Sequence, residues 1–345
     1  MEYRSLGRSG VEVSALCLGT MMFGGPTSEE ESRRIIADAA AEGVNFIDTA
    51  DVYRDGDAER IVGRAIAGSR DRWIVASKVG NPMGPERNCQ GLSRRWMLQA
   101  LEESLRRLGT DHLDIWYLHV EDLRTPLEET IEALAAAYNA GKIRYWGFSN
   151  FWGWQIAELV RLADAARLPR PLAAQPLYNA TNRLAEVDYI PACAHFGIGV
   201  VPYSPLARGV LSGKYDPGKD PDPSSRAGRQ DTRIMETEWR PESLEVAARL
   251  KDYAQERGTA PAHLALRWCL NNGSVSSIIA GPRTWDQWRS YVGALKLSFT
   301  AEDEAFFESL VPRGKASTPD YEDPKYPIAG RFPLTNPEKI SGITP

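Results

Sequence analysis

Three observations predict that the chain folds as a (β/α)8 barrel of the α/β class. Short apolar runs and amphipathic helical stretches alternate along the 345 residues, and the apolar runs number eight. Eight parallel strands are the number that closes such a sheet into a barrel. An open doubly wound sheet would carry a GxGxxG turn after an early strand, and the sequence contains none.

Apolar runs bounded by loop residues give the expected strands, which are Ala15–Leu18, Phe46–Asp48, Trp73–Ser77, Ile115–Leu118, Ile143–Phe148, Ala173–Gln175, Gly199–Pro202 and Val275–Ala280. Amphipathic stretches between them predict helices that include Ser28–Glu42, Ser93–Leu108, Leu127–Ala140, Gln155–Arg167 and Val187–Phe196. Ser28 and Glu31 have capping-box spacing at the start of the first helix. Gly43, Gly109 and Gly141 each follow a helical stretch, where a left-handed residue often ends the helix.

Three segments depart from the repeat. Tyr3–Leu6 and Val11–Val13 flank a Gly-Arg-Ser-Gly turn and predict a β-hairpin that plugs the barrel bottom. Ala207–Trp239 is a long polar insertion after the seventh strand, and loops of that length are usually functional or disordered. Residues 312–345 form a Pro-rich tail, which we expect to pack on a barrel formed by residues 1–311. The aromatic residues of the tail are Tyr321, Tyr326 and Phe332.

Composition excludes several classes of function. The net charge of −5 argues against broad binding to nucleic acid or a membrane surface. The start lacks the apolar region of a signal peptide, and no apolar run reaches the length of a membrane span. The cysteines form no CxxC pair, so we expect free thiols in a reducing cytoplasm. The four histidines form no metal-binding pair, so we expect no metal site. We expect a monomer or weak homo-oligomer. The cysteines are Cys17, Cys89, Cys193 and Cys269.

Four titratable residues fall at the carboxyl ends of three successive strands, where barrel active sites lie. Asp48 ends the second strand and Tyr53 follows it, Lys78 ends the third strand, and His119 ends the fourth. Neighbouring strands are about 4.8 Å apart, so these side chains can converge. We expect Lys78 to lower the pKa of Tyr53, Asp48 to hold Lys78, and His119 to orient a substrate oxygen. These residues therefore predict carbonyl reduction with Tyr53 as general acid.

These segments resemble the aldo-keto reductase superfamily over residues 1 to 295. Phe46–Tyr53 resembles its Asp–Tyr motif, Ala76–Gly80 its lysine strand, and Trp116–His119 its histidine strand. The resemblance implies that Asp48, Tyr53, Lys78 and His119 are a catalytic tetrad and that NADPH is the cofactor.

The resemblance also implies a cofactor site. Ser149, Asn150 and Gln175 would bind the nicotinamide carboxamide and Tyr203 would stack on its ring. The segment from Arg208 to Lys214 would fold over the pyrophosphate, and Arg283 would bind the 2′-phosphate, which favours NADPH over NADH. At the adenine, where the family often has an acid and Asn, this chain has Ser290 and Tyr291. The implied cofactor residues are Gly19, Thr20, Met21, Asp48, Ser149, Asn150, Gln175, Tyr203, Ser204, Pro205, Leu206, Arg208, Gly209, Lys214, Gly281, Arg283, Gln287 and Tyr291.

Loops after the strands would form the substrate pocket. Their apolar and aromatic side chains favour a hydrophobic or bulky aldehyde or ketone, such as a xenobiotic ketone, over a phosphorylated sugar. The expected substrate residues are Met22, Phe23, Tyr53, His119, Val120 and Trp152.

Two alternatives use the same fold. Potassium-channel β subunits resemble this family and keep the cofactor site while acting mainly as binding partners. A Schiff-base aldolase would use Lys78 as its nucleophile, and the predicted cofactor residues would then have no purpose.

Overall fold

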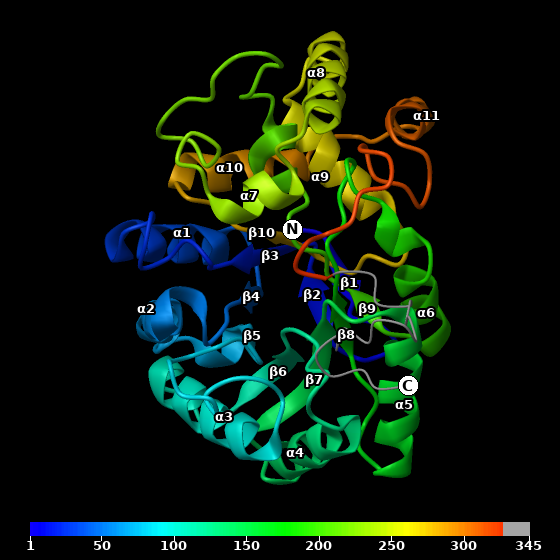
Figure 1. Cartoon of the computed structure of the whole chain (residues 1–345). Helices are drawn as coiled ribbons and strands as arrows, with labels where there is room; N and C mark the ends of the chain where they lie inside the picture. The colour runs from blue at the N-terminus through cyan, green and yellow to red at the C-terminus, as the bar shows by residue number, and fades with distance from the viewer. Residues whose placement is uncertain (327–345) are drawn as a thin grey trace.

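A computed structural model describes residues 1–326 of the chain. Its main sheet is parallel and has the order β10-β3-β4-β5-β6-β7-β8-β9. The helices surround the strands on the outside (Figure 1). This confirms the predicted (β/α)8 barrel. The strands are β3 (Leu16–Gly19), β4 (Phe46–Asp48), β5 (Ile74–Val79), β6 (Leu113–Leu118), β7 (Ile143–Ser149), β8 (Ala173–Gln175), β9 (Gly199–Val200) and β10 (Ile278–Ala280).

The barrel closes between β9 and β10 through single contacts rather than a regular ladder. Val200 forms a parallel bridge with Val275, and the Ile279 N–H donates to the Pro202 carbonyl over 3.0 Å. The predictions Gly199–Pro202 and Val275–Ala280 were therefore too long for regular strand. Pro202 has no N–H to donate, which interrupts the ladder at that point.

The helices begin and end largely where the capping residues indicated. Ser93 accepts a hydrogen bond from the Trp96 N–H at the start of α3, and Gly109 ends it with φ 64°. Ser28 caps α1, but the Glu31 carboxylate accepts from the Trp285 N–H rather than closing a capping box. The helices are α1 (Glu29–Ala41), α2 (Asp57–Ile66), α3 (Arg94–Leu108), α4 (Leu127–Asn139), α5 (Gly153–Ala165), α6 (Tyr189–Phe196), α7 (Thr232–Thr237), α8 (Pro241–Glu256), α9 (Pro261–Asn271), α10 (Trp285–Ala294) and α11 (Ala301–Leu310), with short 3-10 turns η1 (Tyr53–Gly56), η2 (Arg70–Arg72), η3 (Leu184–Glu186) and η4 (Ala207–Ser212).

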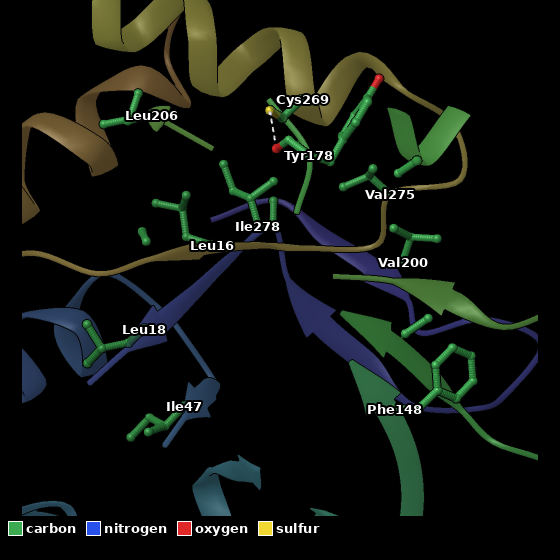
Figure 2. Packing of buried hydrophobic residues seen from close by; sticks show 14 of the residues in the cluster. Leu16, Leu18, Ile47, Phe148, Tyr178, Val200, Leu206, Cys269, Val275 and Ile278 are labelled. Carbon is green, nitrogen blue, oxygen red and sulfur yellow. Dashed lines mark hydrogen bonds between the residues drawn. The ribbon is translucent and has the colours of Figure 1, made fainter. Parts of the chain in front are cut away.

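Strand side chains alternate between two hydrophobic clusters, as a period of two requires. Leu16 and Leu18 of β3 belong to the outer cluster between strands and helices, whereas Cys17 belongs to the cluster inside the barrel. Figure 2 shows Leu16 and Ile278 in the layer beneath Cys269 of α9. Because both clusters are buried, the strands form a rigid platform for the residues at their ends.

The N-terminal hairpin joins β1 (Tyr3–Ser5) to β2 (Glu12–Ser14). Leu6 and Val13 are fully buried in the interior cluster. The Arg8 N–H donates to the carbonyl of Gly197, just before β9. The hairpin therefore covers the bottom of the barrel, opposite the carboxyl ends of the strands.

The insertion after β9 is more regular than a loop, since it contains η4 and α7. The described part of the tail, residues 312–326, returns across the barrel. The Ser317 N–H donates to the Thr181 carbonyl over 2.8 Å, and Asp323 forms an ion pair with Arg233 of α7. Phe332 lies outside the described residues, and the division at residue 311 stays a prediction. Among the described residues, no helix is long and apolar enough to cross a membrane.

Candidate active site

The four predicted catalytic residues converge at the carboxyl ends of β4, β5 and β6. Lys78 Nζ donates to Asp48 Oδ1 over 2.5 Å, to the Thr49 carbonyl over 2.7 Å and to the Tyr53 hydroxyl over 3.2 Å. Lys78 and Asp48 are almost fully buried, with exposed fractions of 0% and 2%. All three protons of the Lys78 ammonium are therefore directed to acceptors, and one of them is aimed at Tyr53.

Burial and charge act in opposite directions on these groups. Burial would lower the pKa of Lys78, but the Asp48 carboxylate and the Tyr53 hydroxyl outweigh it, so this pKa is raised and the ammonium stays charged. Burial raises the pKa of Tyr53 more than Lys78 and Arg208 lower it. The expectation of a lowered pKa for Tyr53 is therefore wrong. At neutral pH Tyr53 is a protonated phenol, able to donate a proton.

His119 lies beside Tyr53, with ring centroids 5.9 Å apart and the planes nearly perpendicular. Burial lowers its pKa well below 6.5, and the Lys78 and Lys325 charges add to the effect. The imidazole is therefore neutral at pH 7. Its Nδ1 is buried and has no hydrogen-bond partner among the described residues.

A cavity of about 690 Å³ opens above this group and is lined by Asp48, Tyr53 and His119. Polar side chains on β7, β8 and the loop after β9 extend the network along its wall. Asn150 Nδ2 donates to the His119 carbonyl over 3.0 Å and to Ser149 Oγ over 2.8 Å, and its Oδ1 accepts from the Tyr203 hydroxyl over 2.8 Å. Gln175 Nε2 donates to Asp48 Oδ2 over 2.9 Å. The tetrad and the predicted nicotinamide residues thus form one hydrogen-bonded unit.

The rest of the cavity wall is strongly basic. Its lining includes seven cationic and two acidic side chains. The acidic ones are Asp48 and Asp222, and the cationic ones are Arg208, Lys214, Arg226, Arg229, Arg233, Arg283 and Lys325. Arg226 pairs with Asp231 and Arg233 with Asp323. Among the described residues, Arg208, Lys214 and Arg283 form no ion pair. Arg283 precedes the N-terminus of α10, where the helix dipole also favours an anion.

All 18 residues predicted to bind the cofactor line this cavity. Of the predicted substrate residues, Met22, Tyr53 and His119 line it too. The structure does not bring the other three to it. Phe23 is fully buried in the outer hydrophobic cluster, Trp152 precedes α5 with 38% of its surface exposed, and Val120 is not part of the lining. Phe23 and Met22 are neighbours in the chain, and only Met22 reaches the cavity.

Sequence reasoning missed a second set of lining residues, in the insertion and the tail. The run of arginines at 226, 229 and 233 was a readable signal, since it concentrates positive charge within a glycine- and proline-rich segment. No local pattern marked the two tail residues. The missed residues in these segments are Ser212, Tyr215, Asp222, Ser224, Ser225, Arg226, Arg229, Arg233, Lys325 and Tyr326.

Comparison with known proteins agrees with this geometry. The model of the aldo/keto reductase family matches residues 15–311. The chain is 38% identical over 285 residues to a probable voltage-gated potassium channel subunit beta of Arabidopsis thaliana, covering 81% of this chain and 87% of that protein. It is 35% identical over 333 residues to the uncharacterized oxidoreductase YrpG of Bacillus subtilis, covering 93% and 99%. It is 34% identical over 330 residues to the L-glyceraldehyde 3-phosphate reductase of Escherichia coli O157:H7, covering 91% and 94%. The chain belongs to the aldo/keto reductase family.

Proposed function

We propose that the protein is an NADPH-dependent reductase that converts an aldehyde or ketone to the alcohol. The observation that carries this proposal is the hydrogen-bonded series Asp48–Lys78–Tyr53 at the base of a large cavity, with neutral His119 beside it. A buried ammonium that touches a protonated phenol is the arrangement that a general acid needs when negative charge develops on a carbonyl oxygen.

The residues of the cavity fit a phosphorylated dinucleotide. Ser149, Asn150 and Gln175 offer hydroxyl and carboxamide groups next to the tetrad, and Tyr203 offers an aromatic face. Farther along the same wall, Lys214 and Arg283 supply unpaired positive charge, which suits phosphate groups. These residues would hold NADPH, and Arg283 would contact the 2′-phosphate that distinguishes it from NADH.

The nicotinamide, when bound, would supply the hydride that reduces the carbonyl carbon. The Tyr53 hydroxyl would donate its proton to the carbonyl oxygen, which otherwise becomes an alkoxide. Lys78 stabilises the resulting phenolate because it already contacts that oxygen, and Asp48 keeps Lys78 charged. His119, held neutral, would orient the carbonyl oxygen toward Tyr53. Proton donation of this kind contributes about 10²- to 10⁴-fold to the rate.

The test is a titration of the purified protein with NADPH and NADH, followed by the quenching of its tryptophan fluorescence. We expect saturable binding that is tighter for NADPH, and consumption of NADPH absorbance when an aromatic or bulky aliphatic carbonyl compound is added. If neither nucleotide binds, the reductase proposal is wrong.

A channel-type binding role is the second candidate, and the similarity to plant channel β subunits favours it. It predicts nucleotide binding with no turnover of any carbonyl compound. Membrane-extract pull-downs with the NADPH-loaded protein would then recover a channel subunit.

A Schiff-base role for Lys78 conflicts with its surroundings. A nucleophilic lysine must be neutral and reachable, whereas Lys78 is fully buried, its protons are engaged, and its pKa is raised. Borohydride treatment with a carbonyl compound should therefore leave Lys78 unmodified.

A further inference from the structure

The tail adds to the cavity wall one cation that neither the family motifs nor the sequence pattern assigned. Lys325 and its neighbour Tyr326 line the same cavity as Tyr53 and His119. Lys325 keeps a large solvent-exposed surface, and partial burial lowers the pKa of its ammonium.

Contacts with Arg233 of α7 and with Arg240, directly before α8, hold this part of the tail in place. Asp323 accepts hydrogen bonds from both terminal nitrogens of Arg233, over 3.0 and 2.7 Å. The Arg240 guanidinium lies 3.9 Å above the ring of Tyr321 and donates to Thr318. Lys325 therefore follows a segment fixed at two points, and its own backbone N–H donates to Asp323 over 2.9 Å.

The positive charge of Lys325 is not neutralised locally. Asp323 lies two residues before Lys325, and Arg233 binds both of its carboxylate oxygens. Among the described residues, no carboxylate forms an ion pair with Lys325. Arg208, on the same wall, forms none either and donates instead to Thr237. Lys325 is also close enough to His119 to add to the lowering of the pKa of that imidazole, after burial and Lys78.

A cation without an ion-pair partner, in the same cavity as Tyr53 and His119, would attract an anion on the substrate itself. We propose that Lys325 makes this site select carbonyl compounds that carry an anionic group, a carboxylate or a phosphate. The inference rests on the proposed reductase function and names its substrate class. It refines the expectation of a hydrophobic substrate, because the aromatic side chains of Tyr53, Tyr203 and Tyr326 line the same cavity.

Three para-substituted benzaldehydes test the proposal with NADPH: 4-carboxybenzaldehyde, 4-formylphenyl phosphate and the neutral methyl 4-formylbenzoate. The readout is kcat/KM for each anionic aldehyde divided by that for the neutral ester. The matched variants are Lys325→Met and Lys315→Met, since Lys315 is an exposed lysine of the same tail that does not line the cavity. Comparing variants cancels the intrinsic reactivity of each aldehyde.

We expect Lys325→Met to lower this ratio by about 10- to 100-fold, the usual effect of one charge-assisted hydrogen bond. Lys325→Arg should restore most of the ratio, and Lys315→Met should leave it as in the parent protein. The larger fall, for the carboxylate or for the phosphate, identifies the anion. NADPH affinity, measured by fluorescence, should be the same in Lys325→Met and the parent.

Three outcomes would overturn the inference. If Lys325→Met lowers kcat/KM equally for charged and neutral aldehydes, the lysine does not recognise a substrate anion. If instead it weakens NADPH binding, the lysine serves the cofactor. If the parent protein consumes NADPH with the neutral ester alone, the substrate class is wrong while the reductase function stands. Failure to turn over any of the three aldehydes would count against the reductase function itself.

Discussion

The two sides of the cavity are built in opposite ways. The strand-end group comprises Asp48 and Lys78 in buried strands, His119 directly after β6, and Tyr53 at the start of η1. The charges of Asp48 and Lys78 compensate each other. The loop wall, formed by residues 207–239 and 312–326, is polar, and the Arg233–Asp323 ion pair joins its two segments.

Left-handed backbone occurs on both sides of the cavity, since Arg54 and Asp55 directly after Tyr53 also have φ 53°. Arg208 in the loop wall has φ 53°, a left-handed conformation that costs a residue with a side chain roughly 1 kcal/mol or more. Asp48 and Lys78 lie in regular strands. The proposed reaction chemistry therefore depends mainly on residues at the strand ends, whereas the proposed ligand selection depends on the loop segments.

Removing the charge of Lys78 should give the largest effect. Lys78→Met leaves Asp48 as a buried, unpaired carboxylate, so we expect the free energy of unfolding to fall by about 3–5 kcal/mol and turnover to fall by at least about 100-fold. Lys214→Met in the loop wall is the control, and it should change stability by less than about 1 kcal/mol. Urea unfolding measures both. Equal losses in the two variants would contradict the contrast between the regions.

Arg283, which lies between β10 and α10, tests the proposed cofactor site of the cavity. Arg283→Ala should weaken NADPH binding by about 10-fold or more, because one charge-assisted hydrogen bond to a phosphate is lost, and should affect NADH much less. Fluorescence titration gives both constants. Equal weakening of the two nucleotides would mean that Arg283 does not contact the 2′-phosphate.

The Arg233–Asp323 pair tests how the loop wall is held. The pair is partly exposed, so Asp323→Asn should lower the free energy of unfolding by less than about 1 kcal/mol. Local opening should nevertheless increase, since this pair joins the tail to α7, and limited proteolysis within residues 312–326 should become faster. A double-mutant cycle with Arg233→Met isolates the pair. An unchanged rate of cleavage in Asp323→Asn would show that other contacts hold the tail against α7 without this ion pair.

The pH dependence of the reaction should be the smallest effect. The pKa of His119 lies well below 6.5 and that of Tyr53 above 10, so neither group changes protonation between pH 7 and 9. His119 gains a proton only in a more acidic solution than a free imidazole needs. Tyr53 loses its proton only in a more alkaline solution than a free phenol needs. We expect kcat/KM for reduction to be level over this range. A bend near pH 7 that disappears in His119→Gln would contradict a neutral His119.

Much of the strand-end group was predictable from sequence, because it depends on local patterns. A polar residue after a short apolar run is at a strand end whatever the rest of the fold does, which located Asp48, Lys78 and His119. Gly109 likewise ended a helix as its conformational freedom predicted.

The rest depended on packing that no local pattern encodes. The net shift in the pKa of Tyr53 is set by burial, which the sequence does not state. Phe23 fills the core although its neighbour Met22 lines the cavity. Lys325 reaches the cavity because Asp323 meets Arg233, a residue 90 positions earlier in the chain.

The most direct test of the central claim is the Tyr53→Phe variant, which removes the phenolic oxygen and keeps the ring. Its NADPH affinity should match that of the parent protein, while single-turnover oxidation of NADPH by an aldehyde should slow by about 10²- to 10⁴-fold. That result would identify Tyr53 as the proton donor of a carbonyl reductase. Full activity in Tyr53→Phe would contradict the account, because the hydrogen bond from Lys78 would then serve no catalytic purpose.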